Sequence, residues 1–378
     1  MLVKNATTFL DGRFCPGTSL HISGGRIAQI GGDLPAGPAL DIGGDYLLPG
    51  FVDVHIHAFM GMDMMQGEDA VRHMSRELKK MGVAAFLPTT MSQDEESTIR
   101  ALCGIQAVMN RPEPDGAMVL GAHMEAPFLS PDKAGAQRSE FFCRPTLDNW
   151  RKFTGDYESV VKKVTLAPEL PGADDLIRYL TGRGIVVSAG HTQATAGQLR
   201  ASADAGLTSA THLFNAQSPL GHREPGVPGA ALVDDRIYCE FIADGVHLHP
   251  DVVRLICRCK GAARAIAITD ATEAAGMPDG AYQLGGQPVE VTGGVVRLAD
   301  GTLAGSTLTM ARAFTNLVRY GIAPEDACRM TSRTPAESLG LTGYGEIRPG
   351  APAVLVRYDR EWNFVGAVGA LPQTPACG

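Results

Sequence analysis

The segment PGFVDVHIH, residues 49–57, combines a hydrophobic run with three chemically active side chains at alternate positions. Side chains at i, i+2 and i+4 of a β-strand lie on one face, so Asp53, His55 and His57 share a face of the expected strand. A histidine pair on a buried strand needs polar partners, because unpaired polar groups are costly to bury. The segment therefore predicts a strand that carries chemistry at its C-terminal end.

Seven more strand-like runs follow this segment, and amphipathic stretches such as residues 68–82 separate them. Eight strands that alternate with helices over roughly 220 residues indicate parallel βα units. Their number and length fit a closed, TIM-like (β/α)8 barrel of the α/β class. A doubly wound open sheet is the alternative, but no glycine-rich fingerprint follows the first strand. The seven runs are residues 83–90, 118–126, 161–169, 185–192, 209–215, 238–247 and 265–271.

Both ends of the chain have a different pattern, with short alternating strands and Gly-Gly turns. Such turns between alternating runs are typical of β-hairpins. We therefore expect a small β-sandwich domain, built from both chain ends, beside the barrel. The expected boundaries are 1–46, 276–304 and 343–378 for the β domain, 47–275 for the barrel strands, and about 305–342 for helices that close the barrel.

The composition excludes several classes of protein. The chain has 378 residues, 44% of them hydrophobic, and a formal net charge of −8, which argues against a disordered chain and against a nucleic-acid-binding surface. Its eight cysteines match no zinc-finger or thioredoxin spacing and read as reduced thiols. No secretory signal is visible, and no apolar run approaches the ~18 residues of a membrane span. We expect a cytoplasmic protein with no membrane or nucleic-acid partner.

Histidine and acidic residues fall at the C-terminal ends of the expected strands. In a closed barrel these ends meet at one mouth, where active sites lie. Five of the ten histidines fall there, together with carboxylates. Imidazole and carboxylate groups are ligands for Zn²⁺ or Fe²⁺, so the pattern predicts a divalent metal site. The residues are His55, His57, Glu125, His191, His212, His247 and Asp270.

Seven segments between about residue 47 and residue 350 carry a family resemblance. They are PGFVDVHIH, GAHMEAPFLSPDKAGA, SAGHTQAT, THLFNAQSPLGHREPGVPGAAL, DGVHLHP, ITDATEAAGMPDG and GTLAGSTLTM. Together they resemble the amidohydrolase superfamily of metallo-dependent hydrolases and, within it, the N-acetylglucosamine-6-phosphate deacetylases. The resemblance implies hydrolysis of the acetamide of N-acetylglucosamine 6-phosphate to glucosamine 6-phosphate and acetate, in amino-sugar catabolism.

The resemblance also implies a set of metal ligands. Glu125, His191 and His212 match the main ligands of the family, and His55 with His57 match a pair that can complete a second site bridged by Glu125. One ion and two ions both fit this pattern.

Many amidohydrolases instead bridge two metals with a carboxylated lysine at the end of the fourth strand. Here that strand ends in LAPEL, and Lys162 and Lys163 lie at its other end. This difference favours the deacetylase branch over enzymes that open cyclic amides.

Two residues match the family's catalytic positions. Asp270 corresponds to the general base, which takes a proton from water activated by the metal and returns it to the leaving amine. His247, in DGVHLHP, corresponds to the residue that stabilises the oxyanion.

The phosphate group requires its own positive partner in an acidic protein. Arg223 matches the family's phosphate-binding arginine, which can come from the neighbouring subunit of a homodimer, and a guanidinium group suits phosphate oxygens. Asn215 and Ala216 offer further donors by position, and His222 lies beside Arg223.

Two departures from the family pattern leave the sugar open. Gln137 stands where many members have a phosphate-binding histidine, and Gln217 stands where methionine is common. The alternatives are an epimer such as N-acetylgalactosamine 6-phosphate, an N-acyl amino acid or cyclic amide, and, from a different class, a catalytically silent scaffold.

Overall fold

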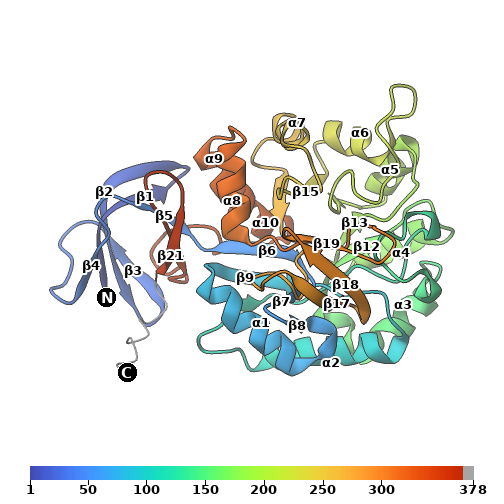
Figure 1. Ribbon diagram of the computed structural model, residues 1–378, viewed down its shortest axis with the longest axis horizontal. Coiled ribbons are helices and arrows are strands. Elements are labelled where there is room, and N and C mark those ends of the chain that lie inside the picture. Colours follow the sequence, from blue (N-terminus) through green and yellow to red (C-terminus); the bar gives the residue numbers. More distant parts are fainter. Residues whose placement is uncertain (369–378) are drawn as a thin grey trace.

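The computed structural model describes residues 1–368 as a helix-rich barrel beside a smaller, all-β body (Figure 1). The final residues of the expected β domain, 369–378, lie outside the described part of the chain. Within residues 1–368, no helix is both long enough and apolar enough to cross a membrane.

The barrel consists of parallel strands that pair in one three-stranded and one six-stranded run. The Thr90 amide, which donates to the His123 carbonyl at 2.9 Å, joins the two runs. The last strand returns to the first, where the Asp270 amide donates to the His55 carbonyl at 2.9 Å and closes the ring. The third strand position is split in two at Gly121, whose φ is +143° and whose added Cβ would lie 2.4 Å from Lys162 Cγ. The barrel strands are β6 (Phe51–Ile56), β9 (Val83–Pro88), β10 (Met118–Val119), β11 (Ala122–Met124), β12 (Val161–Leu166), β13 (Val186–Ala189), β14 (Ser209–Ala210), β15 (Tyr238–Ile242) and β16 (Ala265–Ile268). The expected (β/α)8 barrel is confirmed.

Helices cover the outside of the barrel because each has one apolar face. Helix α1, for example, buries Val71, Met74 and Leu78 at helical spacing. Helices α8 to α10 close the barrel after its last strand. The helices are α1 (Glu68–Lys80), α2 (Glu95–Asn110), α3 (Leu147–Thr154), α4 (Ala173–Thr181), α5 (Ala196–Asp204), α6 (Gly226–Val233), α7 (Pro250–Lys260), α8 (Met310–Arg319), α9 (Pro324–Thr331) and α10 (Arg333–Ser338).

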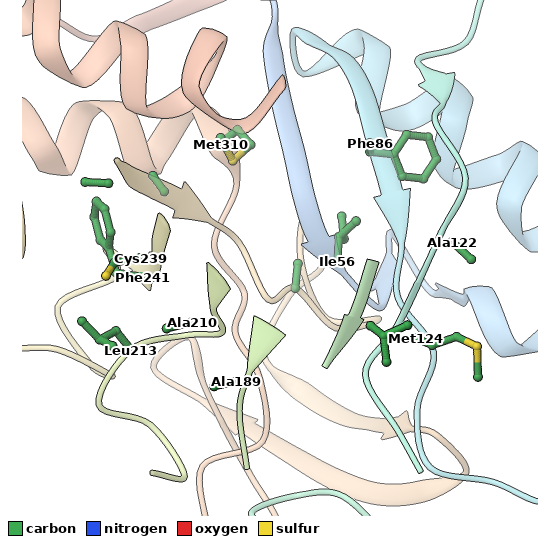
Figure 2. Close-up of a cluster of buried hydrophobic side chains, with 14 of the residues drawn as sticks. Ile56, Phe86, Ala122, Met124, Ala189, Ala210, Leu213, Cys239, Phe241 and Met310 are labelled. Carbon is green, nitrogen blue, oxygen red and sulfur yellow. The ribbon is translucent and has the colours of Figure 1, made fainter. Parts of the chain in front are cut away.

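The hydrophobic core lies around the barrel strands. Figure 2 shows Ile56, Phe86, Met124, Ala189 and Phe241 from different barrel strands, all of them fully buried. Their burial fixes the register of each strand, since a slip of one residue would turn the apolar set to the opposite face.

Apolar and polar side chains alternate along β6, so one face of the strand packs in the core and the other carries the candidate site residues. Val52 and Val54 pack in one buried cluster with Leu308, Ala313 and Ala336, which lie at or within the closing helices. Successive side chains of a strand point to opposite faces, so the face that carries the histidines is turned into the barrel.

The β domain joins both ends of the described chain in one seven-stranded sheet, with β20 pairing antiparallel to β5. It has its own hydrophobic cluster, which includes Val3, Leu20, Ile27 and Leu355. Its strands are β1 (Leu2–Leu10), β2 (Arg13–Ser23), β3 (Arg26–Ile30), β4 (Ala39–Asp41), β5 (Tyr46–Pro49), β20 (Leu355–Tyr358) and β21 (Phe364–Val368).

Residues 276–304 do not join this sheet, contrary to our expectation. They form a separate sheet of β17 (Gly280–Leu284), β18 (Gln287–Thr292) and β19 (Val295–Arg297). Loops of the barrel hold it in place: the Gly285 amide donates to Asp63 Oδ2 at 3.1 Å, and Gln287 Nε2 donates to the Ala136 carbonyl at 2.8 Å. Strands β7 (Ala58–Phe59) and β8 (Met62–Asp63) form a small hairpin nearby.

Candidate active site

A cavity of about 490 Å³ opens at the C-terminal ends of the barrel strands. Its volume falls in the range of small-molecule sites. The predicted site residues that line it are His57, Glu125, Gln137, His191, His212, Asn215, Ala216, His247 and Asp270. His55 lies immediately beneath, fully buried.

Several of these residues adopt backbone conformations that are unusual for their type. His191, His212, Ala216 and Asp270 have φ values of +46°, +30°, +49° and +51°, in the left-handed region that non-glycine residues seldom occupy. Residues in such conformations cluster at functional sites, where the surrounding structure holds them. The turns after β13, β14 and β16 therefore aim these side chains at the mouth of the barrel.

Glu125, just after β11, is the centre of the cluster. Its Oε1 lies 3.0 Å from His212 Nε2 and 3.3 Å from both His191 Nε2 and His55 Nε2, and its Oε2 lies 3.2 Å from His57 Nε2. The ligand atoms form two groups that share Glu125, one with His55 and His57 and one with His191 and His212. Each group has a geometry that could hold a metal ion.

The outer nitrogens of two of these imidazoles show that a cation fits. His57 Nδ1 lies 3.0 Å from the Thr89 carbonyl, and His191 Nδ1 lies 2.8 Å from the Lys133 carbonyl. A carbonyl oxygen only accepts, so in the neutral rings Nδ1 carries the proton and Nε2 turns a lone pair toward Glu125. Lone pairs that face a carboxylate repel it unless a cation lies between them, as in carboxylate–histidine metal sites.

Asp270 stands at the edge of the cluster and borders the cavity. Its Oδ1 lies 3.1 Å from His57 Nε2 and 3.6 Å from His55 Nε2. Burial raises the pKa of Asp270, but the neighbouring His55 and His57 outweigh it and hold the pKa below its usual range. The group is therefore an ionised carboxylate, able to accept a proton.

His247 is held by a neighbour that our sequence analysis missed. Its Nδ1 lies 2.7 Å from Asp244 Oδ2, and Asp244 Oδ1 accepts from the backbone amides of Val246 and His247 at 2.8 Å each. Burial alone would lower the pKa of His247. The carboxylates of Asp244 and Asp270 raise it by a larger amount, so the pKa lies above its usual value. The i, i+3 spacing in DGVH was the signal for this pair.

Gln137 contacts a proposed metal ligand. Its Nε2 donates to Glu125 Oε2 at 2.6 Å, and its Oε1 accepts from the Ser92 amide at 2.8 Å. A glutamine held at both ends is a fixed donor to the central carboxylate. Asn215 also has local partners, since its Nδ2 donates to the His212 carbonyl at 3.1 Å.

Arg223 and His222 lie exposed in the loop before α6 and are not among the cavity-lining residues of the described chain. The cations that do line the cavity are Lys133, in the loop after β11, and Arg297, on β19. The sequence carried no signal for Arg297, because its position depends on where the β17–β19 sheet docks.

A second polar layer lies deeper in the barrel. Asp53 lies two residues before His55 on β6, and its Oδ2 accepts from Thr269 Oγ1 at 2.5 Å. Burial raises the pKa of Asp53 to about 6. Lys163 on β12 forms an ion pair with Glu240 on β15, and both side chains are buried. The ammonium group of Lys163 is therefore paired inside the barrel, away from the mouth.

Known proteins resemble this chain over most of its length. The Amidohydrolase family model matches residues 46–367. The chain is 39% identical to an N-acetylglucosamine-6-phosphate deacetylase of Lysinibacillus sphaericus over 340 residues, 88% of this chain and 87% of the relative. It is also 39% identical to an N-acetylgalactosamine-6-phosphate deacetylase of Escherichia coli over 318 residues, 83% of this chain and 84% of the relative.

A solved structure has a closely similar fold. It is that of a mutant N-acetyl-D-glucosamine-6-phosphate deacetylase from Mycobacterium smegmatis in complex with N-acetyl-D-glucosamine-6-phosphate. The TM-score is 0.90 at 32% identity, over 98% of both chains.

Proposed function

Because the chain belongs to the amidohydrolase family, we propose that it hydrolyses the acetamide of N-acetylglucosamine 6-phosphate to glucosamine 6-phosphate and acetate, in amino-sugar catabolism. The observation that carries this proposal is the cluster of four imidazoles around Glu125, with Asp270 beside it, at the floor of one cavity. The names of the relatives supply the substrate.

The family is metal-dependent, and the donor set fits a divalent ion. Glu125, His191 and His212 would hold one ion, and His55 and His57 with Glu125 would hold a second. Such an ion supplies Lewis-acid chemistry, which makes water more acidic and polarises the amide carbonyl. Nitrogen and oxygen ligands of this kind suit Zn²⁺ or Fe²⁺.

Asp270 moves the proton of the reaction. Its carboxylate accepts a proton from the water that attacks the acetamide carbon, and it then delivers that proton to the amine nitrogen as the C–N bond breaks. An amide does not release an unprotonated amine readily, so the same residue serves both halves of the reaction. Its position at the cavity edge, 3.1 Å from His57, supports this role.

His247 stabilises the charge that develops on the amide oxygen. Asp244 accepts from Nδ1, which leaves the other ring nitrogen as the one directed to substrate, and a charged imidazole there donates to the oxyanion.

Replacing Asp244 by asparagine should lower kcat by about 10²-fold, the lower end of the loss expected for an oxyanion donor. The change removes the negative charge and one of the two acceptor oxygens that hold the 245–247 turn and the His247 ring, but it leaves every proposed metal ligand in place. Steady-state kinetics and elemental analysis check this, with Asp251→Asn on the exposed face of α7 as the matched control. An unchanged kcat would show that Asp244 has no part in catalysis.

The phosphate lies at the outer part of the cavity in this proposal. Asn215 and Ala216 line it and provide neutral donors, while Lys133 and Arg297 add positive charge from the same chain. Arg223 would come from a second copy of the chain in a homodimer, because the Arg223 side chain of the same chain does not line the cavity. A charge-assisted, two-pronged hydrogen bond to phosphate is the reason for an arginine there.

A kinetic panel of N-acetylated hexosamines, each with and without the 6-phosphate, tests the substrate. We expect kcat/KM to be highest for N-acetylglucosamine 6-phosphate. The Arg223→Ala variant should lose about 10- to 100-fold in kcat/KM on the phosphorylated sugar, the equivalent of one hydrogen bond to a charged group, and nothing on the free sugar. Arg100→Ala, on the exposed surface of α2, is the control. Equal efficiency on phosphorylated and free sugars would contradict the phosphate site.

The same panel distinguishes the two epimers, N-acetylglucosamine 6-phosphate and N-acetylgalactosamine 6-phosphate, by their kcat/KM values. The chain has the same 39% identity to a relative named for N-acetylgalactosamine 6-phosphate, so that sugar is the second candidate. N-Acyl amino acids and cyclic amides are less well supported, because Lys163 is committed to Glu240 and offers no bridging group at the mouth. All expected ligands are present, which argues against a silent scaffold. Cytoplasmic location stays a prediction from the sequence.

A further inference from the structure

Two buried polar atoms face each other beneath the proposed metal centre without forming a hydrogen bond. They are Nδ1 of His55 on β6 and Oε2 of Glu240 on β15, which lie 3.6 Å apart. Neither atom has a hydrogen-bond partner among residues 1–368, and their side chains are 0% and 1% exposed. Buried polar groups are nearly always paired, so the two atoms are each other's available partners.

The other oxygen of Glu240 is already occupied. Oε1 forms an ion pair with the Lys163 ammonium group from β12, and Lys163 is fully buried as well. A continuous polar chain therefore crosses the barrel interior from Lys163 through Glu240 to His55. His55 then reaches the proposed metal centre, since its Nε2 lies 3.3 Å from Glu125 Oε1.

Metal binding by His55 depends on which ring nitrogen carries the proton. The ring binds an ion through Nε2 only if the proton is on Nδ1, and a carboxylate, which only accepts, stabilises that form when it faces Nδ1. The corresponding atoms of His57 and His191 face the carbonyls of Thr89 and Lys133. His55 thus has the stronger, charged acceptor, on the side of the second ligand group.

We propose that Glu240, held in place by Lys163, is a positioning residue that keeps the proton of His55 on Nδ1, so that His55 Nε2 is free to bind a metal ion together with His57 and Glu125. This inference rests on the proposed function, since it concerns the same metal centre. It adds two residues, Lys163 and Glu240, that touch neither substrate nor metal.

The alternative is that Lys163 and Glu240 are a structural ion pair and nothing more. Removing one partner would leave an uncompensated buried charge and would destabilise the fold, whereas replacing both with apolar residues is often neutral. We therefore compare two double variants. Lys163→Met/Glu240→Met removes both charges and the acceptor, and Lys163→Met/Glu240→Gln removes both charges but keeps an amide carbonyl that can face His55.

The experiment is a titration of metal-free protein with Zn²⁺, followed by calorimetry and elemental analysis, with thermal unfolding of the metal-free proteins as the fold control. Wild type should bind two equivalents. The Met/Met variant should keep the first equivalent at wild-type affinity and bind the second about 10- to 100-fold more weakly, the usual effect of losing an outer partner of a metal ligand. The Met/Gln variant should recover most of that loss.

Two results would overturn the inference while leaving the deacetylase proposal intact: two equivalents at unchanged affinity in the Met/Met variant, or a single equivalent in wild type. No zinc binding and no hydrolysis in wild type would instead overturn the proposed function itself. A second measurement uses the wild-type protein and so does not depend on whether a variant folds. In zinc-loaded protein labelled with ¹⁵N-histidine, NMR should find the His55 proton on Nδ1. A proton on Nε2 would contradict the proposal.

Discussion

The Asp270→Asn variant is expected to keep its metal and to lose turnover of N-acetylglucosamine 6-phosphate by a factor on the order of 10³ or more. The amide that replaces the carboxylate has nearly the same shape and still lies beside His57, so the ligands around Glu125 are undisturbed. It cannot accept a proton at neutral pH, however, so both water activation and amine protonation fail. The effect should fall on kcat, because a group that acts in the transition state contributes little to ground-state binding.

The measurement is a steady-state assay paired with elemental analysis of the same preparations. Asp251→Asn on the exposed surface of α7 is the matched control, since it makes the same chemical change far from the cavity. Turnover within a few-fold of wild type, at full metal content, would remove Asp270 from the proton-transfer role.

Removal of the metal is also expected to have a large effect on deacetylation. Chelation followed by dialysis should reduce deacetylation to background, and returning one divalent ion species should restore it. The metal-free protein should also unfold at a lower temperature, because a ligand that binds only the native state stabilises it by mass action. The structural reason is that buried Glu125 and four imidazoles lose the cation that their converging atoms require.

The Glu125→Ala variant tests metal dependence by mutation instead of by chelation. Glu125 is shared by both ligand groups, so its loss should weaken every equivalent of metal, unlike a change at His55 or His191, which belong to one group each. Glu96→Ala, on the exposed surface of α2, is the control. Full activity in protein shown by elemental analysis to be metal-free would contradict a metal-dependent mechanism.

Much of the barrel could be predicted from the sequence because its strands are short apolar runs at regular intervals. The mouth residues followed from one rule, that the C-terminal ends of parallel strands converge. His191 and His212 are far apart in the sequence, and the rule placed them together; their Nε2 atoms lie 3.2 Å apart.

The partners of Asp53 and the docking of residues 276–304 could not be predicted in the same way. A period of two assigns Asp53 to the face of His55 and His57 but says nothing of its partners. The structure pairs its carboxylate with the Thr269 hydroxyl, outside both groups of proposed metal ligands. Residues 276–304 were recognisable as strands, yet the sheet that they join depends on long-range anchors such as Asp63 to Gly285.

The orientation of Gln137 is a third example. Its place in the loop after the third strand follows from the motif, but its contact with Glu125 depends on the Ser92 amide that holds its other end. The Lys163–Glu240 pair was invisible for the same reason, because a lysine and a glutamate on non-adjacent strands meet only when the barrel closes.

The most direct test of the account is product analysis of N-acetylglucosamine 6-phosphate incubated with the metal-loaded protein in H₂¹⁸O. The account predicts one acetate and one glucosamine 6-phosphate for each substrate consumed, with one ¹⁸O atom in the acetate and none in the phosphate, because water attacks the acetamide carbon. Release of inorganic phosphate, or no release of acetate at any metal loading, would contradict it.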